Sequence, residues 1–263
     1  GFHLVQNDGA STNYFGKNLV NTVADGIYHM GFEIQGDRFL NEDGNANATL
    51  SDVASWLNVF YNQAVLVNGD CAANTIAGSD DKEQINAGGG NDRVNAGGGN
   101  DLVYGGSGND AVDGGAGNDL IYGGAGNDAL AGGAGDDVFR VLGSKASGFE
   151  GYDTYNGGDG SDAIVAVGSD VDIGLTGFGA ANGIEAIDFS ALTGQGRLLG
   201  DGNANVLDFS ATTLVGHVAI DGGNGDDRIT GSAGAEILIG GNGNDVLSGK
   251  AGNDLLYGGS GRD

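Results

Sequence analysis

A nine-residue unit repeats without a gap from residue 87 to residue 140, and this repeat limits the possible folds more than any other feature. The six blocks are AGGGNDRVN, AGGGNDLVY, GGSGNDAVD, GGAGNDLIY, GGAGNDALA and GGAGDDVFR; position six is always Asp and position eight always apolar. After seven further residues, GFEGYDTYN (148–156) and GGDGSDAIV (157–165) resume the register, and a second array begins at Gly222. A short fixed period predicts stacked turns of chain, each contacting only its neighbours.

Each block joins a glycine-rich half to a short alternating half. Glycine at positions one, two and four allows positive φ angles and close backbone packing, so we expect the first six residues to turn. The last three residues place one apolar side chain between two others, which predicts a strand buried on one face. Two turns and two strands form one coil, and stacked coils predict an all-β parallel solenoid.

Apolar burial alone cannot stabilise such coils. Each coil buries about two aliphatic side chains at roughly 1.5–3 kcal/mol each, against about 1–2 kcal/mol for ordering each of its residues. We therefore expect metal ions to supply the missing stabilisation. The available ligands are Asp carboxylates and turn carbonyls, with no Cys or His in residues 87–165 or 222–263. Flexible sites made only of oxygen favour Ca²⁺ over Mg²⁺, Zn²⁺ or Cu²⁺.

Turns nine residues apart alternate between two sides of the coil, so each ion is expected between turns of adjacent coils. Asp119, for example, should serve one site with Asp101 and another with Asp137. The candidate carboxylate ligands are Asp92, Asp101, Asp110, Asp119, Asp128, Asp137, Asp153, Asp162, Asp227, Asp245, Asp254 and Asp263. The candidate turn glycines are Gly88, Gly90, Gly97, Gly99, Gly106, Gly108, Gly115, Gly117, Gly124, Gly126, Gly133, Gly135, Gly223, Gly225, Gly241 and Gly243. Counting turns predicts about six to ten Ca²⁺ ions, clustered at 87–165 and 222–263.

The composition excludes several classes of protein. The chain of 263 residues has 36 Asp plus Glu against 10 Lys plus Arg, a formal net charge of −26, and 56 Gly without Pro. Collagen requires Pro, and nucleic-acid binding requires Lys and Arg, so neither class fits. No apolar run is long enough to span a membrane, and regular apolar spacing argues against disorder. The single Cys71 cannot form an internal disulfide.

The blocks GGSGNDAVD, GGAGNDLIY and GGNGNDVLS resemble the calcium-binding nonapeptides of the repeats-in-toxin (RTX) family, and the resemblance extends from near Gly78 to Asp263. It implies a right-handed parallel β-roll, calcium-dependent folding outside the cell and export by a type I secretion apparatus. The implied location is therefore secreted or at the cell surface. Family members include toxins, proteases, lipases, alginate epimerases, surface-layer proteins and adhesins, so the resemblance implies a fold more narrowly than a role.

Three blocks depart from the pattern. Block 231–239 has Ala235 and Glu236 where Asn and Asp are usual, and blocks 69–77 and 78–86 keep an apolar eighth residue but lack the Asp. We expect no ordinary calcium site in any of them.

Residues 166–221 lack calcium turns but contain an internal echo, AIDFSALTG at 186–194 and VLDFSATTL at 206–214. A calcium-poor stretch of the same solenoid is favoured over a separate inserted domain, with core candidates Ile187, Phe189, Leu207 and Phe209. The predicted organisation is an N-terminal cap or the end of a preceding domain (1–68), a first array (69–165), the calcium-poor coils (166–221) and a second, truncated array (222–263).

The N-terminal region has a different pattern. From residue 51 to residue 61 the apolar residues Val53, Trp56, Leu57 and Phe60 follow helical spacing, which predicts an amphipathic helix in a small α+β segment. Residues 43–47 resemble the start of an EF-hand loop, but Ala48 and Ala54 occupy its key positions, so an Asn-rich turn is favoured. Because the chain begins at Gly1 and stops within a repeat, we expect a fragment, and missing targeting signals carry no weight.

The sequence contains no recognisable catalytic motif. His3, His29 and His217 stand alone, and neither a G-x-S-x-G elbow nor a P-loop is present. The region is therefore not expected to be an enzyme. One hypothesis is a structural and binding region of a large secreted adhesin or surface-layer protein, with calcium as ligand and cell-surface carbohydrate or neighbouring copies as candidate partners. The alternative is the C-terminal folding and secretion module of a secreted protease, lipase or alginate epimerase.

Overall fold

A computed structural model describes residues 5–7, 12–14, 64–143 and 149–263. The chain divides into two units, Gly1–Gln63 and Ala64–Asp263. In the first unit, β1 (Val5–Asn7) pairs antiparallel with β2 (Thr12–Tyr14). The helix expected at 51–61 and the EF-hand-like turn at 43–54 lie outside the described residues. Within the described ranges, no helix is long and apolar enough to cross a membrane.

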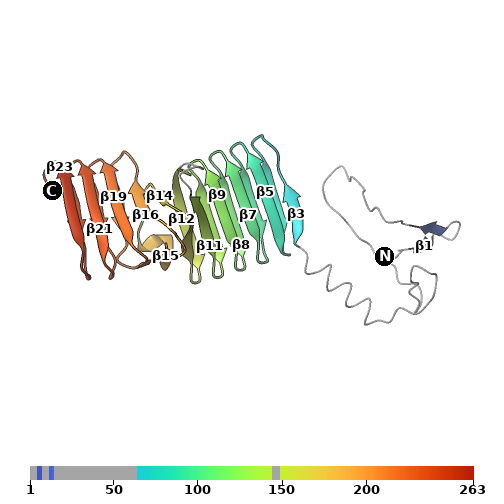
Figure 1. Cartoon of the computed structure of the whole chain (residues 1–263). Helices are drawn as coiled ribbons and strands as arrows, with labels where there is room; N and C mark the ends of the chain where they lie inside the picture. The colour runs from blue at the N-terminus through green and yellow to red at the C-terminus, as the bar shows by residue number, and fades with distance from the viewer. Residues whose placement is uncertain (1–4, 8–11, 15–63, 144–148) are drawn as a thin grey trace. The chain divides into compact units, whose positions relative to one another are not determined.

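The second unit is a parallel β-roll, in which successive strands alternate between two large sheets (Figure 1). The ten-stranded sheet contains, in chain order, β4 (Thr75–Ser79), β6 (Arg93–Gly97), β8 (Ala111–Ala116), β10 (Ala129–Ala134), β12 (Tyr152–Asp159), β14 (Val171–Leu175), β16 (Gly196–Gly200), β19 (Val218–Asn224), β21 (Glu236–Asn242) and β23 (Leu255–Ser260). The eight-stranded sheet contains β3 (Val65–Asn68), β5 (Glu83–Gly89), β7 (Leu102–Ser107), β9 (Leu120–Ala125), β11 (Val138–Gly143), β13 (Ala163–Gly168), β15 (Ala186–Asp188) and β18 (Thr213–Val215). A three-stranded sheet contains β17 (Val206–Asp208), β20 (Arg228–Thr230) and β22 (Val246–Ser248), and η1 (Ala180–Asn182) is a 3₁₀ helix. The predicted all-β parallel roll is confirmed.

The repeat strands are longer than the sequence predicts. In β7 and β9 the pairing begins at Leu102 and Leu120 and continues through the glycines Gly106 and Gly124. A strand therefore covers the last three positions of one block and the first three of the next. The prediction that the first six positions all turn is wrong, because positions one to three can pair with the equivalent residues of the neighbouring coil. The turn is confined to positions four to six.

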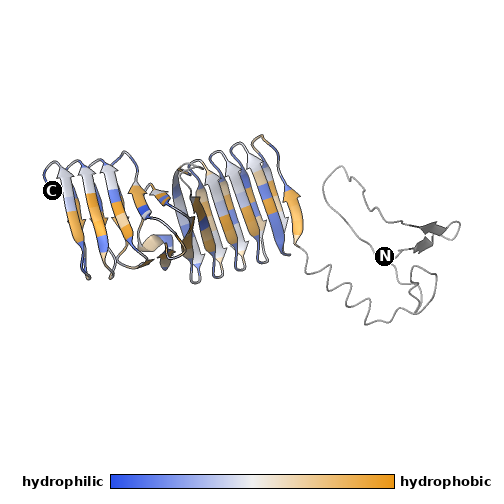
Figure 2. Cartoon of the chain, viewed as in Figure 1, coloured by the Kyte–Doolittle hydropathy of each residue, from blue (hydrophilic) through white to orange (hydrophobic). Residues whose placement is uncertain are grey.

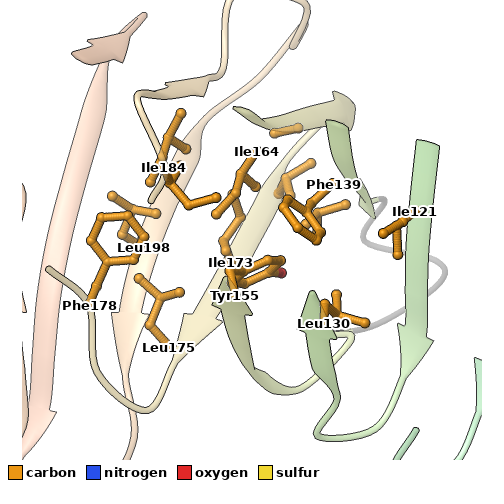
Figure 3. Close-up of a cluster of buried hydrophobic side chains, with 14 of the residues drawn as sticks. Ile121, Leu130, Phe139, Tyr155, Ile164, Ile173, Leu175, Phe178, Ile184 and Leu198 are labelled. Carbon is orange, nitrogen blue, oxygen red and sulfur yellow. The ribbon is translucent and has the colours of Figure 1, made fainter. Parts of the chain in front are cut away.

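The eighth positions form the core of the roll, as predicted. Val94, Val112 and Leu130 lie on the ten-stranded sheet and Val103, Ile121 and Phe139 on the eight-stranded sheet, and all six side chains are buried. In Figure 2 the apolar segments recur at matching places on successive strands. Figure 3 shows how the side chains continue this core into the next part of the chain, where Phe139 meets Tyr155 edge to face.

The stretch between the arrays continues the same roll. In the ten-stranded sheet β14 and β16 lie between β12 and β19, and β15 and β18 extend the eight-stranded sheet. Its four core candidates, Ile187, Phe189, Leu207 and Phe209, are all buried. The stretch is therefore part of the same solenoid, as the sequence favours, and its low calcium content stays a prediction. The first coil begins at β3, within the segment that the sequence assigns to the N-terminal region.

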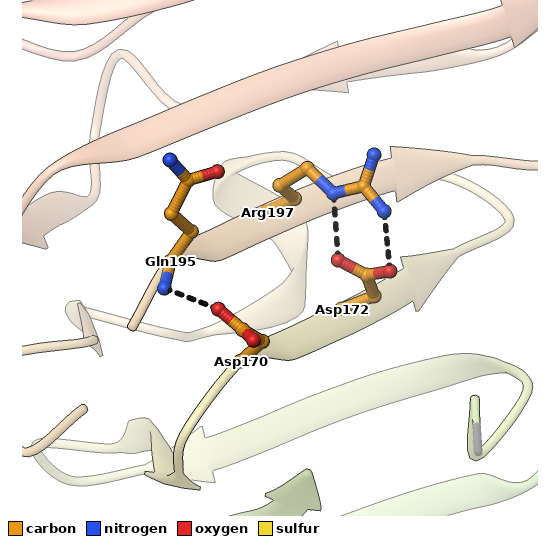
Figure 4. Close-up of polar contacts among 4 residues, drawn as sticks. All are labelled: Asp170, Asp172, Gln195 and Arg197. Carbon is orange, nitrogen blue, oxygen red and sulfur yellow. Dashed lines mark hydrogen bonds and ion pairs between the residues drawn. The ribbon is translucent and has the colours of Figure 1, made fainter. Parts of the chain in front are cut away.

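Polar side chains also cross between coils in this stretch. Arg197 on β16 donates from Nε to Oδ1 of Asp172 on β14 at 2.7 Å, and the Gln195 N–H donates to Oδ1 of Asp170 at 2.9 Å (Figure 4). Charge on β14 is thus balanced by a side chain of the protein itself.

Candidate metal centre

The Asp residues at position six form rows along the roll, and we call each row member a rung. The Asp92 N–H donates to Oδ1 of Asp110 at 2.8 Å, and the Asp110 N–H donates to Oδ1 of Asp128 at the same distance. These rungs are 18 residues apart, as the sequence predicts. The first array has the rows Asn74–Asp92–Asp110–Asp128–Asp153 and Glu83–Asp101–Asp119–Asp137–Asp162–Glu185. The second has Asn205–Asp227–Asp245–Asp263 and Glu236–Asp254.

Most rungs leave their second carboxylate oxygen without a partner. Among the residues that the structure describes, the buried Oδ2 atoms with no hydrogen-bond partner are those of Asp92, Asp101, Asp110, Asp119, Asp128, Asp137, Asp162, Asp227 and Asp245. Native structures pair almost all buried polar atoms, because an unpaired buried carboxylate is costly. A cation beside each Oδ2 would remove that cost. Buried, hard, anionic oxygens fit Ca²⁺.

Position-one glycines provide the space beside these oxygens. The point that a Cβ on Gly105 would occupy lies 2.8 Å from Oδ2 of Asp110 and 2.5 Å from the carbonyl oxygen of Gly123 in the next coil. We call this shared space the cradle. The carboxylate of one coil and the position-one carbonyl of the next converge there. No three His, Cys, Asp or Glu side chains cluster within the described ranges, so a cation would rely on backbone carbonyls as well as carboxylates.

The candidate turn glycines at positions two and four adopt the conformation that glycine favours. Their φ angles are all positive, from 93° at Gly223 to 141° at Gly243. Positive φ is not found at position one, so the predicted conformational role of that glycine is wrong: its lack of a Cβ leaves the cradle open. The carbonyl group of each glycine at position two or four lies against the glycine at the equivalent position of the following coil. The carbonyl of Gly88, for example, lies against Gly106.

Five rung carboxyls of the first array have strongly raised pKa values in the metal-free roll. Burial raises the pKa of Asp119 and of Asp128 to about 7, and that of Asp101, Asp137 and Asp153 to about 6. The charges of neighbouring rungs raise the pKa values of Asp119 and Asp128 further, whereas the backbone N–H of the preceding rung opposes the shift. The rows therefore hold like charges close together in a poorly solvated place, which a cation would stabilise.

Asp153 differs from the other rungs of its row. The buried hydroxyl of Tyr155 donates to its Oδ2 at 3.1 Å. The protein itself thus satisfies the oxygen that the other rungs leave open. The sequence did not predict this contact, although a Tyr at the normally aliphatic position eight was its visible signal.

The rows also open in a way that the sequence analysis missed. Each opening residue, which is Asn or Glu rather than Asp, bonds to the side chain four residues earlier, at position two of its block. The pairs are Asn74 with Asp70, Glu83 with Ser79, Asn205 with Asp201 and Glu236 with Ser232. The signal that could have found them is the polar residue at position two, where the repeats have glycine. At the other end of one row, Glu185 Oε2 accepts the Asp162 N–H at 2.7 Å.

Comparison with known families identifies the repeats. The sequence model of the RTX calcium-binding nonapeptide repeat matches four segments, residues 77–112, 104–139, 219–247 and 230–263. A search of curated proteins finds no match to the chain. The matched segments contain the rungs from Glu83 to Asp137 and from Asp227 to Asp263.

Proposed function

Because both of its arrays are RTX calcium-binding nonapeptide repeats, the chain belongs to that family, and we propose that it is the calcium-dependent structural and binding region of a large secreted bacterial adhesin or surface-layer protein. The repeats indicate a calcium-binding β-roll of a type I secreted protein. Beyond this, we propose the biological role of the chain and that it folds outside the cell.

The unpaired buried Oδ2 atoms carry the calcium part of this proposal. Each is held in place by an N–H bond to Oδ1, and most face the space beside a position-one glycine, as Asp119 does beside Gly114 and the carbonyl oxygen of Gly132. Asp92 and Asp101 have Ala87 and Ala96 at position one instead. A bound Ca²⁺ would supply positive charge to two successive coils. Because the carboxylates of different coils meet only in the folded roll, the free energy of calcium binding contributes directly to folding.

The affinity expected for such sites suits folding after export. Extracellular calcium modules bind with dissociation constants of about 10⁻⁴–10⁻³ M, far above cytosolic free calcium and near extracellular concentrations. With a net charge of −26 and 56 glycines, the metal-free chain repels itself and resists ordering. The chain would stay extended inside the cell and fold outside it.

Circular dichroism of the whole chain tests the calcium switch. We expect little β signal in EGTA and a cooperative gain as free calcium rises through about 10⁻⁴–10⁻³ M, with Mg²⁺ a poor substitute. A full β spectrum in EGTA would show that the apolar core is sufficient and would contradict the switch.

The continuous ten-stranded sheet supports a structural role. It passes from the first array through the middle stretch into the second, so the two arrays form one element that could stiffen a longer chain. Sedimentation and glycan-binding measurements with calcium present test for the expected self-association or carbohydrate binding. A chain that stays monomeric and binds no glycan would favour the alternative, a folding and secretion module of a secreted protease, lipase or alginate epimerase.

A further inference from the structure

We propose that Glu83 and Glu236, which stand where the repeats have Asp, are calcium ligands that add one cation site at the start of each of two rows. The proposal rests on the proposed function, because it extends rows that bind calcium. It differs from the sequence expectation that blocks 78–86 and 231–239 contain no ordinary site.

The Glu83 carboxylate is placed like that of an Asp rung. Its side chain is buried, and its backbone N–H donates to Oδ1 of Asp101 at 2.7 Å. Within the described part of the chain, Oε2 of Glu83 is buried with no hydrogen-bond partner. The point that a Cβ on Gly78 would occupy lies 3.1 Å from this oxygen and against the carbonyl oxygen of Ala96 in the next coil. Glu83 Oε2 therefore faces the same cradle as the Asp Oδ2 atoms.

Glu236 repeats this arrangement in the second array. Its buried side chain places Oε2 2.9 Å from the Cβ point of Gly231, and the carbonyl oxygen of Gly249 lies 2.8 Å from the same point. The Glu236 N–H donates to Oδ1 of Asp254 at 3.1 Å. Oε2 also accepts the Ser232 N–H at 3.1 Å, and a carboxylate oxygen keeps a second lone pair for a cation. The two blocks thus place a Glu carboxylate at the same point of the coil, although Oε2 of Glu83 has no hydrogen-bond partner and Oε2 of Glu236 has one.

Serine at position two explains how the longer side chain fits. An Asp rung is fixed by the N–H of the preceding coil, which donates to Oδ1. At Glu83 that N–H, from Val65, donates to the Lys82 carbonyl oxygen at 3.0 Å instead. The hydroxyl of Ser79 donates to Oε1 of Glu83 and takes the place of the missing donor. The extra methylene lets the carboxylate reach back to this hydroxyl while Oε2 remains in the cradle.

The chemistry of Glu83 and Ser79 favours a bound divalent cation over a purely structural hydrogen bond. The Ser79 hydroxyl donates to Oε1 alone, so within the described residues Oε2 of Glu83 is a buried carboxylate oxygen without a hydrogen-bond partner. Anionic and carbonyl oxygens on two coils are the ligands that Ca²⁺ prefers.

Equilibrium dialysis of the whole chain with radioactive calcium at saturation tests the proposal. Glu83→Gln and Glu236→Gln keep the size of the side chain but remove its charge, and each is expected to lose about one bound ion. Glu83→Asp keeps the charge and leaves Ser79 in place, and it should keep the parental count. Asp113→Asn, which changes an exposed carboxylate on β8, is the matched control and should also keep it.

The outcomes separate this proposal from the proposed function. A parent chain that binds no calcium overturns both. A parent that binds calcium, with folded glutamine variants that bind the same number of ions, overturns this inference alone. If circular dichroism shows that a glutamine variant does not fold in calcium, Glu83→Asp decides: the parental count supports a carboxylate ligand at position 83, and a lower count overturns it.

Discussion

Each Asp rung joins three groups at once. Asp119 accepts the Asp101 N–H at Oδ1, donates its own N–H to Oδ1 of Asp137 at 2.8 Å, and leaves Oδ2 for a cation. Loss of this carboxylate should therefore affect the coils on both sides. The rest of the rung depends on backbone groups, which a substitution leaves in place.

We expect Asp119→Ala to weaken two calcium sites, because its carboxylate lies between the sites shared with Asp101 and Asp137. Calorimetric titration should show a loss of about two ions at moderate calcium. Asp113→Ala removes an exposed carboxylate from β8 and should titrate like the parent. Equal stoichiometry for Asp119→Ala and the parent would contradict the arrangement of the rows.

The raised pKa values predict how pH affects the metal-free chain. Because burial raises the pKa of Asp119 and Asp128 to about 7, the folded roll binds more protons than the unfolded chain between the ordinary pKa of Asp and about 7. The protonated carboxyls contribute stability that is fully present below that range and is lost as pH rises through it. In EGTA, circular dichroism should therefore show more β signal at about pH 5 than at about pH 7.5. A chain more stable at the higher pH would show that these carboxyls are not buried without metal.

The Asp rungs could be predicted from the sequence and the opening rungs could not, for a physical reason. A strict period places the same residue at the same point of every coil, so Asp92 and Asp110 had to become neighbours. Glu83 breaks that period, and the position of its carboxylate depends on a bond to Ser79 that only the folded turn creates. The Tyr155 hydroxyl on Asp153 was missed for the same reason.

At the scale of the strand, glycine determines how closely coils can stack. Gly133 on β10 has a φ angle of 116°, and a Cβ there would meet the backbone of Gly115 in the preceding coil. The 18-residue register and the buried eighth positions followed from the repeat, but the strand lengths did not. Propensity opposes glycine in strands. Pairing between equivalent glycines of adjacent coils nevertheless extends the strands through positions one to three.

We therefore expect Gly133→Ala to destabilise the calcium-bound roll by at least about 1–2 kcal/mol, from the left-handed conformation alone. Thermal unfolding in calcium measures the effect. Gly202→Ala is the control, since a Cβ at that exposed glycine would have no atom within 4 Å. Equal unfolding temperatures for the two variants would contradict the close stacking of coils.

At the scale of the whole roll, two kinds of stabilisation alternate along one continuous sheet. The arrays combine buried apolar side chains with open carboxylates, whereas the middle stretch stacks aromatic rings and balances charge with Arg197 and Asp172. Phe178 and Phe209, for example, stack with ring centroids 4.8 Å apart. The sequence predicted this stretch from its echo of apolar residues. It could not predict the pairing of Arg197 with Asp172, because their separation of 25 residues departs from the repeat.

The bonds between rungs give the roll a built-in polarity. In every row the earlier coil donates the N–H and the later coil brings the carboxylate, so an existing coil orients the one that follows it. Only an opening coil must orient its own carboxylate, with Ser79 or Ser232.

Deleting residues 69–86 should therefore raise the calcium midpoint for folding more than deleting residues 246–263 does. The second deletion removes two rungs, Asp254 and Asp263, yet it leaves every remaining Asp with the donor that holds it. The roll would then assemble in one direction along the chain. The opening coil needs a side chain of its own to orient its carboxylate, whereas each later coil is oriented by the coil before it.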